Sequence, residues 1–253
     1  MIRAVFFDIS GVLYQGDELI PGAVEAVAAV RTSGRAMRFL TNTSRKTGAQ
    51  IADDLAGFGF DIPLQEIITA PSAARDWLAG QGLRPYCLVH PNILSEYSPL
   101  VQNDPNAVLI GDAADDLNYS NLNRAFQLCH DGAALVGIGA NRFFRQGEEL
   151  LLDAGPFIKA IEYAAGVEAV IMGKPSAAFY EQALADVGCA GGEVLMIGDD
   201  VFGDVEGAIQ AGLNAALVQT GKYQPGDEQK IDLDFACLSS VADIMTLLGD
   251  AEP

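Results

Sequence analysis

Short apolar runs alternate along the whole chain with longer segments that place an apolar side chain at every third or fourth position. The run at 4–9, AVFFDI, is almost entirely apolar, which is typical of a strand buried on both faces of a parallel sheet. The segment at 21–34 has helical periodicity, with Pro21 at its start and Gly34 at its end. This alternation predicts βα units joined by right-handed crossovers.

The alternation continues to the C-terminus and predicts a series of further elements. Strands are expected at 35–44, 66–70, 84–91, 106–112, 134–140, 168–175, 193–200 and 214–221. Helices are expected at 45–59, 71–82, 119–132, 155–166, 176–188 and 205–212, with a final amphipathic segment at 239–250. These are more strands than one compact sheet of this length holds. We therefore expect an α/β fold with a doubly wound, mostly parallel, Rossmann-like core at 1–80 and 171–253 and a smaller α/β domain inserted at 81–170.

Composition narrows the class of protein. Half of the 253 residues are hydrophobic, which is typical of a well-packed globular chain, and the net charge of −19 argues against a surface for nucleic acid. The four cysteines contain no C-x-x-C pair and are interpreted as buried thiols of a reducing compartment. No apolar stretch approaches the roughly 20 residues needed to span a bilayer. We expect a cytoplasmic protein with neither a nucleic-acid nor a membrane partner.

Chemically active side chains gather at the ends of four predicted core strands. DISG lies at 8–11, TNTS at 41–44, GKP at 173–175 and GDD at 198–200, with Asp204 shortly beyond. The carboxyl ends of parallel strands share one edge of a sheet, so segments distant in sequence should meet there. Carboxylates, a hydroxyl and amide pair, a lysine and glycines together indicate a site for a phosphoryl group and a hard divalent cation.

Each of these segments also has a purely structural interpretation. Thr41 and Asn42 could cap the following helix, and Lys174 could be a solvated charge before a proline that begins a helix. Asp199 and Asp200 could cap the helix that follows them, although two adjacent acids repel each other without a cation. The four segments in this order and strand context favour the phosphoryl site.

The ordered set resembles the haloacid dehalogenase-like hydrolase superfamily, whose four motifs match Asp8, Thr41, Lys174 and Asp199 with Asp204. The stretches that carry the resemblance are DISGVLY, TNTS, GKPS and MIGDDVFGDVEGA. The insertion lies between the second and third motifs and looks like a type-2 cap. That placement is similar to the nitrophenylphosphatase-like subfamily, and it implies that residues 81–170 form a lid over the strand ends.

The resemblance assigns the nucleophile and a magnesium site. It implies that Asp8 attacks phosphorus and becomes an aspartyl phosphate. It implies that Mg²⁺ is held by the Asp8 and Asp199 carboxylates and the main-chain carbonyl of Ser10. Asp204 and Asp200 would act on the ion through ordered water.

The resemblance also assigns the groups that bind substrate. Thr41 and Asn42, with Thr43 beside them, would bind the transferring phosphoryl group. Lys174 would bind the same group and neutralise the charge that it shares with Asp8.

Ser10 departs from the family pattern, because most phosphatases of the superfamily have aspartate there as general acid and base. Serine keeps the main-chain carbonyl but is a poor acid and base, and such proton transfer is worth roughly 10²–10⁴-fold. Phosphate leaving from pyrophosphate, or imidazole leaving from phosphohistidine, needs much less help than a sugar alkoxide. We therefore predict a Mg²⁺-dependent phosphohydrolase acting on pyrophosphate or on phosphoramidate bonds such as those of phosphohistidine and phospholysine.

Other functions remain open on the sequence alone. The chain could be a phosphatase of small organic phosphates, a phosphotransferase to a hydroxyl acceptor, or a catalytically weakened phosphate-binding or interaction module. The partner is a small phosphorylated substrate or a phosphoamino acid, and pairing into a homodimer is left open. Asp112, Asp115 and Asp116 in the insertion are interpreted as a solvated loop, with selection of a cationic leaving group as the alternative.

Overall fold

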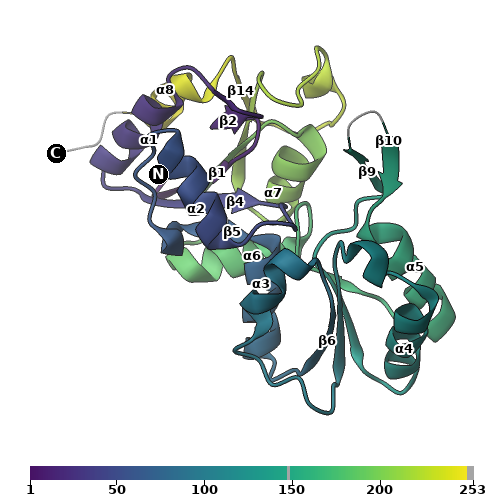
Figure 1. Cartoon of the computed structure of the whole chain (residues 1–253). Helices are drawn as coiled ribbons and strands as arrows, with labels where there is room; N and C mark the ends of the chain where they lie inside the picture. Colours follow the sequence, from purple (N-terminus) through teal and green to yellow (C-terminus); the bar gives the residue numbers. More distant parts are fainter. Residues whose placement is uncertain (147–148, 250–253) are drawn as a thin grey trace. The chain divides into compact units, whose positions relative to one another are not determined.

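The structure is a computed structural model that describes residues 1–146 and 149–249. The chain divides into two compact units (Figure 1). The first contains Met1–Thr41, Ala49–Ile68 and the described chain from Lys174 onward, and the second contains Asn42–Gly48 and Thr69–Gly173. The assignment of a hydrolase core and a cap, with boundaries at 80 and 170, stays a prediction.

The first unit is built on a sheet of six strands within the described residues, in the order β14-β13-β12-β1-β4-β5. The strands are β1 Ala4–Asp8, β4 Ala36–Thr41, β5 Ile67–Thr69, β12 Val194–Gly198, β13 Asn214–Val218 and β14 Ala236–Leu238. β1 pairs in parallel with β4 and β12, and β13 pairs in parallel with β12 and β14. The predicted doubly wound, mostly parallel sheet is confirmed, with β14 as a strand that the sequence pattern did not indicate.

Helices pack on this sheet and explain the apolar run of β1. They are α1 Ala23–Thr32, α2 Gly48–Gly57, α6 Ala177–Val187, α7 Gly207–Gln210 and α8 Met245–Leu248. All five residues of β1 are buried, and Val5 and Phe7 belong to one core cluster with side chains of α1, α2 and α8. The ring of Phe7 stacks on Phe39 of β4, with 5.3 Å between the ring centroids. Burial on both faces is why this strand shows no alternation of apolar and polar residues.

The second unit has its own parallel sheet and core. Its sheet has the order β11-β8-β7-β6, with β6 Pro85–Leu88, β7 Ala107–Ile110, β8 Ala134–Gly137 and β11 Val170–Ile171. Its helices are α3 Ala70–Gly80, α4 Tyr119–His130 and α5 Ala154–Ala165. An antiparallel hairpin of β9 Phe143–Gln146 and β10 Glu149–Leu152 was not predicted.

Short elements complete both units. A small hairpin of β2 Tyr14–Gln15 and β3 Glu18–Leu19 follows β1. The 3₁₀ turns are η1 Leu64–Glu66, η2 Pro91–Tyr97, η3 Ala114–Asp116, η4 Gly191–Glu193, η6 Asp227–Gln229 and η7 Val241–Asp243, and a π-helical segment, η5, spans Val201–Glu206.

Several expected boundaries differ from those of the structure. The strand predicted at 168–175 is limited to β11, and the amphipathic segment predicted at 239–250 is divided between η7 and α8. The strand predicted at 35–44 ends at Thr41, and the helical segment predicted at 205–212 already begins at Val201, where Asp200 caps it. The described residues include no helix of sufficient length and apolar character to cross a membrane.

Candidate active site

Neighbouring strands of the six-stranded sheet end at buried polar side chains. β1 ends at Asp8, whose register partner on β4 is Leu40, and Thr41 is the next residue of β4. On the other side of β1, strand β12 is followed directly by Asp199. Asp8, Thr41 and Asp199 are 5, 4 and 1% exposed. Because the strands are parallel, these side chains reach the same edge of the sheet.

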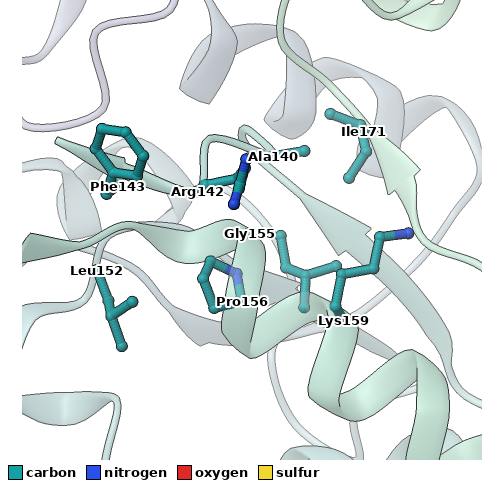
Figure 2. Close-up of a pocket in the computed structure, with 9 residues that line it drawn as sticks. Ala140, Arg142, Phe143, Leu152, Gly155, Pro156, Lys159 and Ile171 are labelled. Atoms are coloured by element: carbon teal, nitrogen blue, oxygen red, sulfur yellow. The ribbon is translucent and has the colours of Figure 1, made fainter.

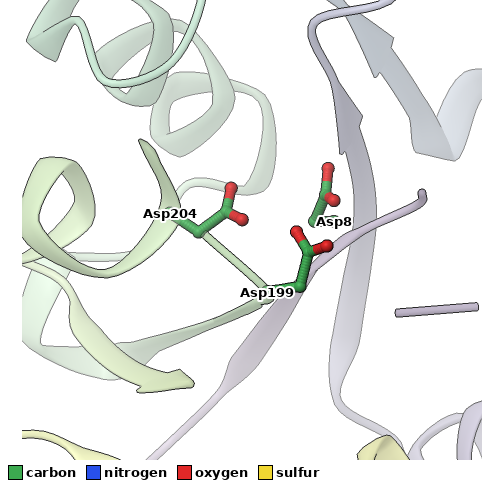
Figure 3. A group of neighbouring side chains, drawn as sticks. All are labelled: Asp8, Asp199 and Asp204. Atoms are coloured by element: carbon green, nitrogen blue, oxygen red, sulfur yellow. The ribbon is translucent and has the colours of Figure 1, made fainter. Parts of the chain in front are cut away.

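Three carboxylates form a compact cluster at this edge. One oxygen each of Asp8, Asp199 and Asp204 lies within 4.8 Å of the others, and all three residues are buried (Figure 3). Asp204 comes from η5, the turn that follows β12. Like charges at this separation, removed from water, repel strongly unless a cation lies among them.

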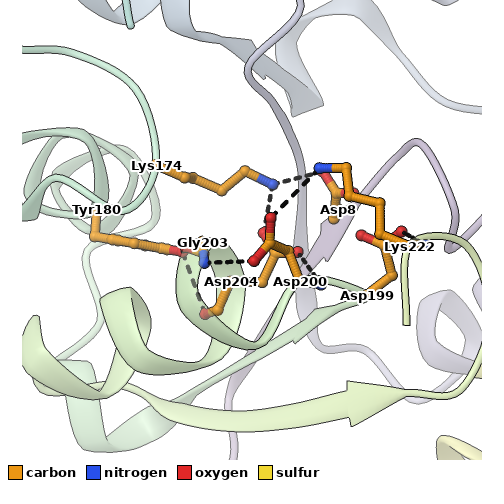
Figure 4. Close-up of polar contacts among 8 residues, drawn as sticks. All are labelled: Asp8, Lys174, Tyr180, Asp199, Asp200, Gly203, Asp204 and Lys222. Atoms are coloured by element: carbon orange, nitrogen blue, oxygen red, sulfur yellow. Dashed lines mark hydrogen bonds and ion pairs between the residues drawn. The ribbon is translucent and has the colours of Figure 1, made fainter. Parts of the chain in front are cut away.

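Lys174 supplies one cation to the cluster. Its Nζ donates hydrogen bonds to Oδ1 of Asp8 at 2.5 Å and to Oδ1 of Asp204 at 2.6 Å (Figure 4). Its side chain is only 5% exposed. Burial lowers the pKa of Lys174, but the opposite charges of Asp204 and Asp8 outweigh this and raise it above its ordinary value. The ammonium group is therefore held in its charged form.

Two acids of the cluster have raised pKa values. Burial raises the pKa of Asp8 to about 7; the positive charge of Lys174 opposes this rise, and repulsion from Asp204 and Asp199 adds to it. Burial likewise raises the pKa of Asp199 to about 6. One lysine thus does not offset three carboxylates, and a further cation would favour their ionised forms.

The two carboxylate oxygens of Asp199 differ in their hydrogen bonding. Its Oδ2 accepts a hydrogen bond from the backbone N–H of Lys222 at 2.6 Å. Its Oδ1 is buried and has no hydrogen-bond partner within the described part of the chain. Buried carboxylate oxygens normally have a partner, and oxygen ligands of this kind suit a hard divalent cation. The donor set of Asp8, Asp199 and Asp204 therefore fits such an ion.

Asp200, unlike the adjacent Asp199, makes its hydrogen bonds to the backbone at the start of η5. Its Oδ1 accepts from the backbone N–H groups of Phe202 at 3.1 Å and Gly203 at 2.9 Å, which caps η5. Burial raises its pKa, but the N–H of Gly203 and the charge of Lys222 outweigh this and lower it below its ordinary value. The helix-capping interpretation applies to Asp200, which lies outside the cluster, and its water-mediated metal role stays a prediction.

Ser10 lies on the loop that leaves β1, and its side chain is exposed. The residue forms an isolated β-bridge with Tyr14. Gly11 next to it has φ +87°, and a Cβ there would lie 2.0 Å from Oδ2 of Asp199. The loop therefore passes directly against the carboxylate cluster, which only glycine permits at this position.

A fifth segment at the same edge was missed by the sequence prediction. The loop after β13 contains Thr220, whose Oγ1 donates to the Gly11 carbonyl at 2.6 Å, and Lys222, whose N–H holds Asp199. The signal was present, because TGK follows a predicted core strand in the same way as the four chosen segments. Tyr180 of α6 was also missed; its hydroxyl donates to the Gly203 carbonyl at 2.9 Å and so supports the turn that bears Asp204.

Asn42 and Thr43 belong to the second unit, although they follow Thr41 directly in the chain. They line a cavity of about 310 Å³ together with Ser44, Arg45, Asp112, Phe144 and Asp153. Their expected role in binding the phosphoryl group together with Thr41 stays a prediction.

The interpretation of Asp112 as part of a solvated loop is wrong. Asp112 is 7% exposed and forms an ion pair with Nε of Arg45, whose guanidinium lies 4.6 Å from the ring centre of Phe144. Asp115 and Asp116 are exposed as expected. Burial next to an arginine 67 positions earlier in sequence cannot be read from local composition.

A second cavity in the second unit contains none of the predicted site residues. It measures about 450 Å³ and lies between the β9–β10 hairpin and α5 (Figure 2). Its walls are mostly apolar, with Arg142 and Lys159 as the charged members.

Comparison with known proteins identifies the family to which the chain belongs. A family model described as haloacid dehalogenase-like hydrolase matches residues 5–99, and a second, described as HAD-hydrolase-like, matches 171–244. The chain is 42% identical over 233 residues to the human phospholysine phosphohistidine inorganic pyrophosphate phosphatase, covering 90% of this chain and 86% of that protein. It is 40% identical to the rat haloacid dehalogenase-like hydrolase domain-containing protein 2, covering 92 and 90%. Its fold is similar to that of p-nitrophenyl phosphatase from Archaeoglobus fulgidus, with a TM-score of 0.88 and 22% identity over 97 and 99% of the chains.

Proposed function

Because the chain belongs to the haloacid dehalogenase-like hydrolases and is a phosphatase, we propose that it cleaves phosphoanhydride or P–N bonds through an aspartyl phosphate on Asp8. The observation that carries this proposal is the buried cluster of Asp8, Asp199 and Asp204, two of which, Asp8 and Asp204, are hydrogen-bonded to Lys174. A merely structural site has little use for three acids and one lysine removed from water.

Asp8 is the proposed nucleophile. Lys174 donates to its Oδ1 at 2.5 Å, and we propose that the other carboxylate oxygen, Oδ2, attacks phosphorus. Attack forms a bond between a carboxylate oxygen of Asp8 and phosphorus, and the bond from phosphorus to the leaving group breaks. Water then hydrolyses the acyl phosphate and restores the carboxylate.

Mg²⁺ is the proposed cofactor. We propose that the Asp8 and Asp199 carboxylates and the Ser10 carbonyl would hold it, with Asp204 and Asp200 acting through water. A bound Mg²⁺ would offset the repulsion between these acids and a dianionic phosphoryl group. The orphaned Oδ1 of Asp199 supports this assignment.

Thr41, Asn42, Thr43 and Lys174 are the proposed phosphoryl-binding residues. Lys174 keeps its charge beside Asp8 and Asp204, which suits it to neutralise the phosphoryl oxygens. Thr41 is the neighbour of Leu40, the register partner of Asp8, which supports a hydroxyl donor next to the nucleophile.

Pyrophosphate, phosphohistidine and phospholysine are the proposed substrate classes. Ser10 removes the usual general acid and base, so substrates whose leaving groups need little protonation are favoured. The name of the human relative, which is 42% identical, supports the same classes. The cytoplasmic location and the homodimer stay predictions.

A phosphate-release panel tests the proposal. The wild-type chain with Mg²⁺ is given pyrophosphate, phosphohistidine, phospholysine and sugar phosphates, beside Asp8→Asn and the control Asp53→Asn, an exposed acid of α2. We expect release from the first three substrates, loss of turnover in Asp8→Asn and wild-type rates in Asp53→Asn. Full turnover by Asp8→Asn would contradict the nucleophile, and preference for sugar phosphates would contradict the substrate class. Phosphorylated product with added alcohols would identify a phosphotransferase instead.

A further inference from the structure

A second lysine, Lys222, reaches the carboxylate edge from the loop after β13. Its backbone N–H donates to Oδ2 of Asp199 at 2.6 Å, and its Nζ lies 3.5 Å from Oδ2 of Asp200 (Figure 4). Its side chain is 70% exposed, whereas that of Lys174 is 5% exposed. The backbone of Lys222 is thus tied to the cluster while its ammonium group stays open to a ligand.

The loop that carries Lys222 is locked against the loop that carries Ser10. A Cβ on Gly11 would lie 2.9 Å from the Cα of Gly221, and a Cβ on Gly221 would lie 2.5 Å from the Cα of Gly11. Both glycines have positive φ, and Thr220 adds its hydrogen bond to the Gly11 carbonyl. Ser10 and Lys222 each adjoin one of these touching glycines, so the position that lacks an acid has a lysine close by.

We propose that Lys222 supplies positive charge to the departing group, in place of the proton that an aspartate at position 10 would supply. This inference rests on the proposed function and adds a catalytic residue to it. Lys174 cannot serve in this way, because its ammonium is bound to the nucleophile Asp8, and the departing group leaves on the opposite side of phosphorus. The ion pair of Lys222 with Asp200 is long and exposed, and such pairs are weak, so a phosphate can displace it.

The bond changes balance without a proton from Lys222. As Oδ2 of Asp8 bonds to one phosphorus of pyrophosphate, the bond from that phosphorus to the bridging oxygen breaks, and its electron pair stays on the departing phosphate. The Lys222 ammonium, protonated at neutral pH, lowers the energy of that developing negative charge. Such stabilisation is sufficient for phosphate as a leaving group, whereas a sugar alkoxide also needs a proton in order to leave.

The test compares Lys222→Met and Lys222→Arg with the wild-type chain. The substrates are pyrophosphate and a series of substituted phenyl phosphates whose leaving phenols range from strongly to weakly acidic. For Lys222→Met we expect kcat/KM for pyrophosphate to fall about 10²-fold, the low end for loss of one preorganised charged donor. The decline of rate with leaving-group basicity should become steeper, because charge on the departing oxygen is no longer stabilised. Lys222→Arg should restore most of kcat/KM for pyrophosphate and most of the shallower dependence on leaving-group basicity, because arginine keeps the positive charge.

The matched control is Lys159→Met, which removes the same charge from an exposed lysine of α5 that forms an ion pair with Glu162. An equal loss on every phenyl phosphate in Lys222→Met, or no recovery in Lys222→Arg, would overturn the inference and indicate a structural role. These outcomes differ from failure of the proposed function. If the wild-type chain releases no phosphate, or if Asp8→Asn remains active, the nucleophile assignment falls and the Lys222 inference falls with it.

Discussion

Lys174 donates from Nζ to Oδ1 of Asp8 across 2.5 Å, and the two side chains are 5 and 7% exposed. The same Nζ binds Asp204 at 2.6 Å. One buried cation thus stabilises two buried carboxylates, and Asp199 adds a third acid to the group. Without a further cation, the three buried carboxylates repel one another more strongly than the single lysine can offset.

Replacing Lys174 by methionine should destabilise the fold and abolish activity. Removing one member of a buried ion pair costs about 3–5 kcal/mol, because an uncompensated charge is left inside. We expect this loss of unfolding free energy in urea titrations above neutral pH. The loss should shrink as the pH falls below about 7, because Asp8, whose pKa is about 7 even beside Lys174, is then protonated. A variant as stable as wild type above neutral pH would contradict the prediction, and Lys159→Met is the control.

Mg²⁺ should stabilise the chain more as the pH rises. The pKa values of Asp8 and Asp199 are raised from 3.8 to about 7 and about 6, first of all by burial. Between pH 3.8 and these values the folded chain binds more protons than the unfolded chain, so with EDTA these two groups lower stability as pH rises through that window. Mg²⁺ binding requires the ionised acids and removes this penalty.

Thermal unfolding with EDTA and with Mg²⁺ measures this effect. We expect the difference in Tm to be small near pH 5 and to grow up to about pH 8, as protons cease to compete with the metal. In Asp199→Asn, the difference in Tm between Mg²⁺ and EDTA should depend less on pH, because one of the ionisable metal ligands has been removed. A Mg²⁺ shift that is constant across this range would be evidence against a metal site on Asp8 and Asp199.

Gly11→Ala should disrupt the site far more than its small change in size suggests. Gly11 has φ +87°, and its added Cβ would lie 2.0 Å from Oδ2 of Asp199. The control is Gly16→Ala, which has φ +61° and nothing within 4 Å of the added Cβ. Both variants place an alanine at positive φ, and this backbone conformation costs about 1–2 kcal/mol of stability for a non-glycine residue. We expect only Gly11→Ala to lose more than this in urea unfolding and to lose stabilisation by Mg²⁺; equal losses would contradict the proposed crowding.

Ser10→Asp should widen the substrate range. The side chain of Ser10 is exposed, so a carboxylate can be accommodated, and it would restore an acid and base beside the nucleophile. We expect sugar-phosphate hydrolysis to rise by about 10²-fold, with little gain on pyrophosphate. Ser10→Asn, which has a similar size without proton transfer, is the control. An equal gain in Ser10→Asn would mean that the leaving-group explanation is wrong.

The sequence alone determined most of the core and the nucleophile candidate. A strand buried on both faces must be apolar throughout, so β1 and its terminal Asp8 were recognisable without coordinates. Parallel strands expose their carboxyl ends at one edge, which made Thr41 and Asp199 candidates from strand order alone. The β9–β10 hairpin was missed because its residues, FFRQ and ELLL, show no alternation of apolar and polar positions. Phe143, Leu150 and Leu152 are more than half exposed, so burial on one face did not impose such a pattern.

Only the tertiary structure decided how neighbouring acids divide their roles. Asp199 and Asp200 are adjacent in sequence and chemically alike, yet one has an orphaned buried oxygen and the other caps a turn. The same holds for the two lysines, since their burial and partners depend on loops 48 residues apart that meet at a single sheet edge. Local sequence fixes which side chains are available at a strand end. Which of them are removed from water, and opposite which charge, is set by long-range packing, and that electrostatic environment decides their chemistry.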